Sequence, residues 1–344
     1  MQSKKNNIVF IDMPLINGWK FVKGLEDETK EVWEVKSYVS NQGRTNFLSN
    51  FFRYAKYFYF SFLIFLNRNK YDKIICWQVF YGIIFAFYCR IFHVKKKNIV
   101  IIKNLVYKPK GNGLIGKLYF HWLKGIIDSQ YIDLYISASE TNTEYCSAEF
   151  GVNKNKFKFI PFSVDDATLL DIEDRELENS NYVLSLGRSN RDWDWFIESF
   201  RGLDYNLIII ADELRHSNLP PNVLHLSNVW DLDTYKYIKY CKCMIIPILI
   251  SDIASGDTVL VRSMSFSKPS IITKPSCLAD DYVVDQFNGL VINKTKEELV
   301  QALNTIYTDD KLYDFLSKNA RESYLSKHTI YQYGINMAKQ IKLI

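Results

Sequence analysis

The sequence contains little glycine and proline, 14 and 8 of its 344 residues, and it has no low-complexity tract and no repeat of a solenoid period. Its six cysteines show no disulfide framework, which fits a reducing cytosol. Cys241 and Cys243 have no matching His or Cys cluster, so we expect no metal site. Apolar residues make up 48% and charged residues 24%, which excludes wholesale disorder, and the length indicates two domains.

Several catalytic signatures are also missing. The sequence has no GxxxxGK[ST] motif, no early GxGxxG motif and no Ser/His/Asp order with a nucleophile elbow. None of the five histidines pairs with Cys or Asp at a catalytic spacing. These absences exclude a P-loop ATPase and argue against a dinucleotide-binding oxidoreductase.

Long hydrophobic runs are lacking as well. The apolar runs Tyr57–Leu66 and Val79–Cys89 are both shorter than the roughly twenty residues that a spanning helix needs. The basic start of the chain precedes only a short apolar stretch, so we do not interpret it as a signal peptide. We therefore expect a cytoplasmic protein.

The net charge of +5 is unevenly distributed. Basic residues crowd the region of the aromatic runs: Arg53, Lys56, Arg68, Lys70, Arg90, Lys95, Lys96 and Lys97. Basic residues beside Phe and Tyr hold proteins on anionic membrane surfaces. Asn46–Lys97 is thus either a membrane-facing surface or a pair of buried helices with a solvated basic flank.

Strand and helix patterns alternate along both halves of the chain. Short β-rich runs such as NIVFID at residues 7–12 and LIIIA at residues 207–211 take turns with helical segments. This alternation predicts an α/β fold with two doubly wound, Rossmann-like domains, whose ligands bind at the carboxyl ends of the strands. With two such domains, we expect the site in a cleft between them.

The predicted organisation has four parts. Residues 1–165 form the N-terminal domain and 182–325 the C-terminal domain, joined by the acidic, polar linker 166–181. Residues 326–344 form a C-terminal helix that we expect to pack back on the N-terminal domain.

Ser255, Gly256, Asp257 and Thr258 follow a predicted strand and open a helix. The backbone N–H groups at a helix start carry partial positive charge and bind phosphate. Glycine permits close approach, and Ser and Thr hydroxyls add donors. Taken alone, the tetrapeptide is equally typical of an ordinary N-cap.

The segment Gly187–Asp192 stands at the carboxyl end of the first strand of the second domain. Arginine suits a diphosphate because its planar fork donates paired hydrogen bonds. We predict that one of Arg188 and Arg191 is functional, Arg191 being the better candidate, and that Asp192 caps the next helix. The alternative is a solvated turn.

The segment Asn228-Val229-Trp230 follows another predicted strand. Its backbone is placed to pair with the edge of a nucleobase, with Trp230 packing against it. The alternative is a loop aromatic that packs on its own helix.

The order of these pieces resembles the C-terminal domain of GT-B glycosyltransferases, the family-4-like, group 1 type. LGRSNRDWDWFIESF, NLIIIADE, NVLHLSNVWDLDTYKYIKYCKCMIIPI and SGDTVLVRSMSFSKPSIIT follow one another as the family's segments do, and YIDLYISASETNTEYCSAEFGVNKNKFKFIPFSVD resembles its passage before the linker. The likeness covers about two thirds of the chain. It implies the GT-B fold, two Rossmann-like domains facing a central cleft, and no cofactor or metal beyond a nucleotide-diphosphate sugar as co-substrate.

The resemblance also implies residue roles. Arg191 stands where the family's basic residue clamps the donor diphosphate, as the catalytic residue, with Gly187 and Arg188 beside it. Ser255, Gly256, Asp257 and Thr258 form the phosphate-binding helix start, and Val229 and Trp230 stand where the base is held.

Arg262 departs from the family pattern, which has a carboxylate there to hold the ribose hydroxyls. An arginine accepts no hydrogen bonds. Three explanations remain open: another acceptor replaces it, Asp257 being nearest; the donor is unusual; or activity has been lost.

In the N-terminal domain the resemblance places the acceptor beside Asn17, Gly18, Trp19, Gln78 and Asn104. The histidine that the family often has near the last two positions is absent, and no other general base is evident, which favours a retaining mechanism.

The sequence thus predicts a metal-independent enzyme that transfers a sugar to a lipid-linked saccharide in capsule or O-antigen biosynthesis. It would act as a peripheral protein on the anionic inner face of the cytoplasmic membrane, without binding nucleic acid. The alternatives are a catalytically inactive glycan-binding or scaffolding partner and a GT-B-like enzyme with other sugar-nucleotide chemistry.

Overall fold

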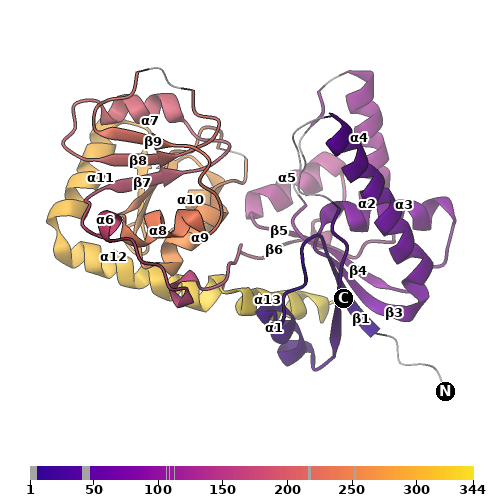
Figure 1. The fold of residues 1–344 in the computed structure, drawn as a ribbon. Helices are drawn as coiled ribbons and strands as arrows, with labels where there is room; N and C mark the ends of the chain where they lie inside the picture. The colour runs from indigo at the N-terminus through magenta and orange to yellow at the C-terminus, as the bar shows by residue number, and fades with distance from the viewer. Residues whose placement is uncertain are drawn as a thin grey trace. The chain divides into compact units, whose positions relative to one another are not determined.

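The computed structural model describes residues 6–40, 47–105, 107, 109–111, 113–215, 218–251 and 253–344. The chain divides into two compact units (Figure 1). Residues Met1–Ile160 and Gly334–Ile344 form the first unit, and Pro161–Tyr333 the second.

The first unit is built on a parallel sheet with the strand order β2-β1-β3-β4-β5-β6. The strands are β1 (Asn6–Ile11), β2 (Trp33–Ser37), β3 (Tyr71–Cys76), β4 (Ile99–Ile102), β5 (Leu134–Ser137) and β6 (Phe157–Phe159). β1, β4 and β5 are buried over nearly their whole length, as in parallel sheets with both faces covered. The strand order reverses between β1 and β3, so the crevice of this sheet lies at their carboxyl ends.

Helices connect these strands. They are α1 (Lys20–Thr29), α2 (Phe47–Asn67), α3 (Val79–Ile91), α4 (Leu114–Ile127) and α5 (Glu140–Phe150). The last helix, α13 (Ile330–Ile341), begins in the second unit and belongs to the first unit from Gly334 onward. The C-terminal residues lie against α1, where a Cβ atom on Gly334 would stand 2.2 Å from the Phe21 carbonyl oxygen. Lys342 and Glu28 form an ion pair of 2.6 Å at the same place.

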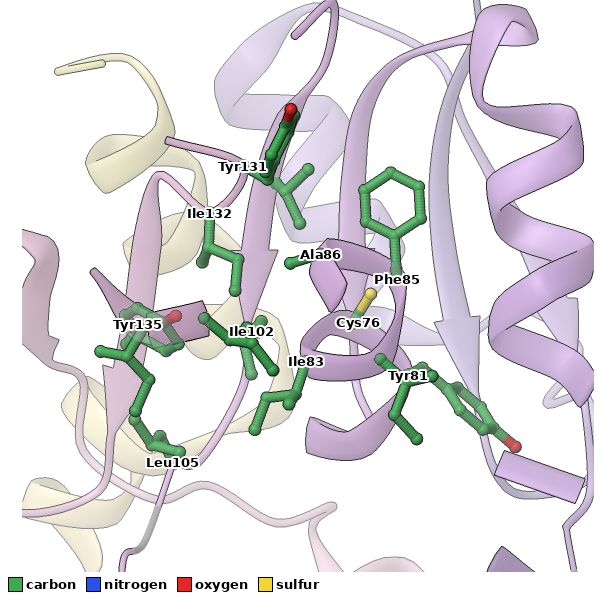
Figure 2. Close-up of a cluster of buried hydrophobic side chains, with 14 of the residues drawn as sticks. Cys76, Tyr81, Ile83, Phe85, Ala86, Ile102, Leu105, Tyr131, Ile132 and Tyr135 are labelled. Carbon is green, nitrogen blue, oxygen red and sulfur yellow. The ribbon is translucent and has the colours of Figure 1, made fainter. Parts of the chain in front are cut away.

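The core between α3 and the sheet is drawn in Figure 2. Ile83 of α3 points toward Ile102 of β4, and Tyr135 of β5 lies further along the same face. The helix lies so close to the sheet that a Cβ atom on Gly82 would stand 2.5 Å from Ile102 Cγ1. A glycine is therefore required at this crossing.

The second unit repeats the plan with the parallel order β12-β11-β10-β7-β8-β9. Its strands are β7 (Val183–Leu186), β8 (Leu207–Ile210), β9 (Val223–Leu226), β10 (Met244–Ile246), β11 (Ser270–Lys274) and β12 (Leu290–Asn293). The order reverses between β7 and β10, which places the crevice of this sheet at the carboxyl ends of those two strands.

The helices of the second unit are α6 (Arg175–Glu178), α7 (Trp193–Phe200), α8 (Asp233–Tyr240), α9 (Asp257–Ser265), α10 (Cys277–Tyr282), α11 (Lys296–Thr308) and α12 (Asp310–Ser323). Side chains of α7 and α11 share one core cluster with the sheet, among them Phe196, Phe200 and Leu303. α9 contacts α8, β10 and β11. Asp192 caps α7 by accepting a hydrogen bond from the Trp195 amide, as predicted from the sequence.

The predicted fold class is confirmed by these two doubly wound units. The sequence reading missed α1, and the reason is local. Its first residue follows Trp19, whose side chain makes no capping hydrogen bond, and only Phe21, Gly24 and Leu25 are buried. The helix therefore lacks both a start signal and a wide apolar face.

The acidic segment 166–181 lies within the second unit. Asp166 pairs with Arg321 at 2.7 Å, and Asp174 with Lys236 at 3.0 Å. The chain thus leaves the first unit before this segment, at Ile160–Pro161. The domain limits given from the sequence remain predictions.

Residues 162–164 and the π-helical turn Tyr324–His328 are held together by a buried network in the second unit. The Val164 amide donates to the His328 carbonyl at 3.1 Å. The His328 ring lies against Tyr282, and its Nδ1 donates to the Phe162 carbonyl at 2.9 Å. Burial lowers the pKa of His328 to about 4. The imidazole is consequently neutral at physiological pH.

We expect His328 to make folding sensitive to acid. Below its ordinary pKa of 6.5 the unfolded chain binds a proton that the folded protein takes up only near pH 4, so stability falls as pH drops through this range. His328→Gln keeps a hydrogen-bond donor for the Phe162 carbonyl but has no titrating ring. Between pH 6.5 and pH 4 its free energy of unfolding should therefore fall by up to about 3 kcal/mol less than that of the wild-type protein. Urea unfolding at several pH values measures this, and parallel pH profiles of the two proteins would contradict it.

Candidate functional site

A cavity of about 390 Å³ lies in the second unit. Its wall contains the residues that the resemblance assigned to the donor site: Gly187, Arg188, Arg191, Val229, Trp230, Ser255, Gly256, Asp257, Thr258 and Arg262. They come from loops after β7 and β9 and from the start of α9, at the carboxyl edge of the sheet. The structure therefore brings together residues that are separated by up to about one fifth of the chain.

The start of α9 forms one side of the cavity. Gly256 is its N-cap with a φ of +91°, and no side chain caps the helix from that position. The Thr258 amide donates to the Asp257 carboxylate at 2.7 Å. The Ser255 hydroxyl accepts from Asn190 Nδ2 at 2.8 Å and donates to the Ile253 carbonyl at 3.3 Å. Within the loop this hydroxyl thus has both a donor and an acceptor partner, and its role as a phosphate donor stays a prediction.

Arg191 lies behind the start of α9 and is only 7% exposed. Its Nη1 and Nη2 donate to the backbone carbonyls of Ser189, Asn190 and Leu186 at 3.2–3.4 Å, and its Nε has no partner. Burial lowers the pKa of Arg191 to about 10, against the opposing charge of Asp257. The guanidinium therefore remains a buried cation at neutral pH.

Two glycines make room for this cation. A Cβ atom on Gly187 would stand 2.8 Å from Arg191 Nε, and one on Gly256 would stand 3.3 Å from Arg191 Nη2. Both residues also have positive φ angles, which L side chains rarely adopt. The Arg191 guanidinium can therefore lie close to the start of α9 only because both positions are glycine.

Trp230 forms another part of the wall and is 47% exposed. Its Nε1 donates to the Asp212 carboxylate at 2.7 Å, and the Asn228 amide donates to the other oxygen at 2.9 Å. The Trp230 indole is thus held by Asp212, which follows β8, and not by the helix that comes after Trp230. Asp212 was missed in the sequence, although an acidic residue directly after the LIIIA strand was a signal that could have found it.

Arg262 lies one helical turn beyond Thr258 on α9, so both side chains share one face of the helix. Its guanidinium lies 5.0 Å from the centre of the Tyr235 ring, and its buried Nε has no partner. Arg262 therefore adds hydrogen-bond donors to the wall of the cavity.

The residues expected on the acceptor side lie in the first unit. Trp19 is buried against Trp77 and Phe21, with ring centres 4.7 and 4.9 Å apart, so its indole is part of the packing. Asn17, Gly18 and Asn104 are exposed in loops.

Gln78 lies at the carboxyl end of β3 and caps α3. Its Nε2 donates to Asp12 at 3.3 Å and to Tyr57 at 3.2 Å. Asp12, at the end of β1, also accepts from the amide and hydroxyl of Ser40. Gln78 and Asp12 therefore mark the crevice between β1 and β3, and Asp12 was not recognised in the sequence.

In the part of the chain that the structure describes, no group of three or more His, Cys, Asp or Glu side chains is arranged to hold a metal ion. Cys241 and Cys243 are buried free thiols whose pKa values burial raises, to about 12 for Cys241.

Comparison with known proteins agrees with this architecture. The family model described as glycosyl transferases group 1 matches residues 171–323, which contain the whole cavity. No curated protein sequence matches the chain significantly.

Solved structures match over nearly the full length. HepE of Anabaena, in complex with UDP and glucose, has 13% identity and a TM-score of 0.68, covering 98% of this chain and 100% of its own. Sucrose-phosphate synthase of Thermosynechococcus elongatus has 13% identity and a TM-score of 0.67, with 98% and 99% covered. WaaG, a glycosyltransferase involved in lipopolysaccharide biosynthesis, has 14% identity and a TM-score of 0.61, with 96% and 98% covered.

The fold is therefore the GT-B fold of glycosyltransferases, as the sequence resemblance predicted. Residues 171–323, which match the glycosyl transferases group 1 model, lie within the second unit.

The close approach of Gly256 to Arg191 makes a prediction. Gly256→Ala should destabilise the protein by about 1 kcal/mol for its positive φ and by roughly 1–3 kcal/mol more for overpacking, because its Cβ would stand 2.9 Å from Leu278 and 3.3 Å from Arg191. Gly202→Ala is the matched control, with a φ of +78° and nothing within 4 Å of the added Cβ. Urea unfolding compares the two variants. Equal losses of unfolding free energy in the two variants would mean that the start of α9 accommodates the added methyl group without overpacking.

Proposed function

We propose that this protein transfers a sugar from a nucleotide-diphosphate sugar to a hydroxyl of a lipid-linked saccharide, in the biosynthesis of a bacterial surface polysaccharide such as capsule or O-antigen. The observation that carries the proposal is the buried Arg191 cation beside the start of α9 on the wall of one cavity. A buried cation that donates to backbone carbonyls, next to a helix N-terminus, favours an anionic ligand.

A diphosphate fits this place chemically. The backbone amides at the start of α9 carry partial positive charge, and Arg191 adds a full charge in a dehydrated setting where electrostatic interactions are strong. Gly187 and Gly256 leave the space in which the Arg191 guanidinium lies beside the start of α9. Arg191 is the catalytic residue in this proposal, since its charge stabilises the leaving diphosphate.

In the reaction the bond between the anomeric carbon and the donor phosphate oxygen breaks, and a bond from that carbon to the acceptor oxygen forms. Negative charge collects on the diphosphate as it leaves, toward Arg191 and the α9 amides. In a retaining mechanism, which we favour, the donor phosphate takes the proton of the acceptor hydroxyl. The proposal includes no metal ion or cofactor.

The nucleoside would lie along α9, beyond the diphosphate. Val229 and Trp230 offer a backbone edge and an aromatic surface, and Asp212 fixes Trp230. Arg262 would donate hydrogen bonds to oxygen atoms of the ribose or the base, whereas the carboxylate of the family pattern would accept them. UDP is the first nucleotide to test, because HepE of Anabaena was solved with UDP-glucose.

The first unit would bind the acceptor at the carboxyl edge of its sheet, near Gln78 and the loops of Asn17, Gly18 and Asn104. A lipid-linked acceptor requires access to a membrane. Among the described residues, the structure contains no helix that is long and apolar enough to cross one. We propose instead that the basic and aromatic segment Asn46–Lys97 lies on the anionic inner face of the cytoplasmic membrane.

Exposed apolar side chains support this surface. Phe51 and Phe52 of α2 are each 59% exposed, and the exposed Lys56 follows one turn later. Leu114, Ile115 and Leu118 of α4 are exposed as well, although the sequence did not suggest them. Lys96, in contrast, is engaged in an ion pair with Asp133, so not every basic residue of the segment is available.

Nucleotide binding should depend on Arg191. We expect UDP or another nucleoside diphosphate to raise the unfolding temperature of the wild-type protein, and Arg191→Lys and Arg191→Met to weaken that ligand about tenfold or more, because a charge-assisted hydrogen bond contributes roughly 1.5–3 kcal/mol. Thermal shift and calorimetric titration measure the two effects. Arg201→Met is the control, since Arg201 pairs with Glu198 at 2.8 Å outside the cavity wall.

Two results would count against the proposal. If the Arg191 variants bind nucleotide as tightly as wild type, the diphosphate lies elsewhere. If no nucleoside diphosphate stabilises the wild-type protein, the alternative of an inactive, glycan-binding or scaffolding partner is favoured, and Arg262 is the residue that keeps this alternative open.

Membrane association should depend on Phe51 and Phe52. We expect the protein to sediment with vesicles containing anionic lipid at low salt, and to be released at high salt. The double variant Phe51→Ser/Phe52→Ser should reduce partitioning about tenfold or more, because two apolar side chains no longer enter the interface. The control is Leu169→Ser/Leu170→Ser, another adjacent exposed pair, in the second unit. Equal sedimentation of both double variants, or indifference to lipid charge, would contradict the assignment.

A further inference from the structure

We propose that Asn190 is a positioning residue that fastens together the two loops of the diphosphate subsite. The inference rests on the proposed function and deepens it. One loop is Gly187–Asp192, which carries Arg191, and the other follows β10 and leads to the start of α9 at Gly256. Asn190 belongs to the first loop and bonds to the second at several points.

The side-chain amide of Asn190 makes contacts on both of its ends. Nδ2 donates to the Ile250 carbonyl at 3.0 Å and to the Ser255 hydroxyl at 2.8 Å, with a longer contact of 3.4 Å to the Ile253 carbonyl. Oδ1 accepts from the Ile250 amide at 2.8 Å. The loop is therefore held at its middle and again immediately before Gly256.

The backbone of Asn190 adds to this fastening. Its φ of +56° is in the left-handed region, where asparagine is favoured among residues with a side chain. Its carbonyl accepts from the Leu249 amide at 3.3 Å and from Arg191 Nη1 at 3.4 Å. One residue thus contacts both the cation and the loop that ends at the helix start.

These contacts require an asparagine amide. A carboxylate has no hydrogens to donate to the two carbonyls and the hydroxyl, and a glycine keeps the backbone conformation but has no side chain. Since the Ser255 hydroxyl donates to Ile253 and accepts from Asn190, it takes part in the same fastening. The subsite then offers the α9 amides and Arg191 in fixed relative positions, which is what tight binding of a diphosphate needs.

The test separates the side chain from the backbone of Asn190. Asn190→Gly should weaken the binding of inorganic pyrophosphate and of UDP by about five- to tenfold, the equivalent of one or two hydrogen bonds. Gln286→Gly is the matched control, because Gln286 is exposed and also has a positive φ, of +57°, so it carries the same entropic cost of glycine. Calorimetric titration gives the affinities. Unchanged affinity in Asn190→Gly would overturn the proposal.

A second variant and a measurement on the wild-type protein keep the proposal testable if Asn190→Gly does not fold. Asn190→Asp should weaken pyrophosphate at least as strongly, since it also brings a negative charge to the subsite. In wild-type protein, hydrogen exchange should show protected Leu249 and Ile250 amides, and exposed exchange there would overturn the fastening whatever the variants do. If wild type keeps this protection but binds neither pyrophosphate nor UDP, the proposed function fails while the fastening stands.

Discussion

The burial of the Arg191 guanidinium is the constraint on which the rest of the site depends. Removing a cation from water is costly, and backbone carbonyls compensate only part of that cost, as the lowering of the pKa of Arg191 to about 10 indicates. The positive end of α9 lies beside it and adds to the cost. The full charge of Arg191 and the partial positive charge of the helix start repel each other, and the charge of Asp257 opposes this repulsion. A diphosphate relieves both at once, which links the local instability to the proposed ligand.

The architecture explains how such an arrangement is maintained. The reversal of strand order at β7 and β10 makes their carboxyl ends neighbours, so the loops after these strands meet. They are then joined by a β-bridge between Arg191 and Ile248, by the Asp192 amide donating to the Pro247 carbonyl, and by the side chain of Asn190. Lys294, after β12, pairs with Asp192 at 3.0 Å and holds the same corner from the edge strand of the sheet. The cation therefore lies on a rigid support at the edge of the sheet.

The sequence predicted the fold class and the residues around the cavity, and the reason is geometric: strands alternating with helices force the strand ends together, so residues that follow the strands must meet. It did not predict how those residues divide their hydrogen bonds. Ser255 resembles a phosphate ligand in sequence, yet its hydroxyl is used by Asn190 and Ile253. Asp212 and Asn190 act through contacts with residues far away in the chain, which no local pattern reveals. α1 was missed because no side chain caps its start and only three of its residues are buried, so its apolar stripe is short.

Arg262 illustrates the limit of resemblance as an argument. Family likeness places a carboxylate there, and the roles of that carboxylate cannot pass to a guanidinium, which only donates hydrogen bonds. The structure nevertheless keeps Arg262 on the cavity wall, lying against Tyr235 with its buried Nε unpartnered. A long side chain with four rotatable bonds loses entropy in such a place, and its packing on Tyr235 offsets part of that loss. Since hydroxyl and carbonyl oxygens both accept from arginine, Arg262 would contact the proposed nucleoside through acceptor atoms of that ligand, where a carboxylate would contact its donors. In that proposal the direction of one hydrogen bond of the site is reversed.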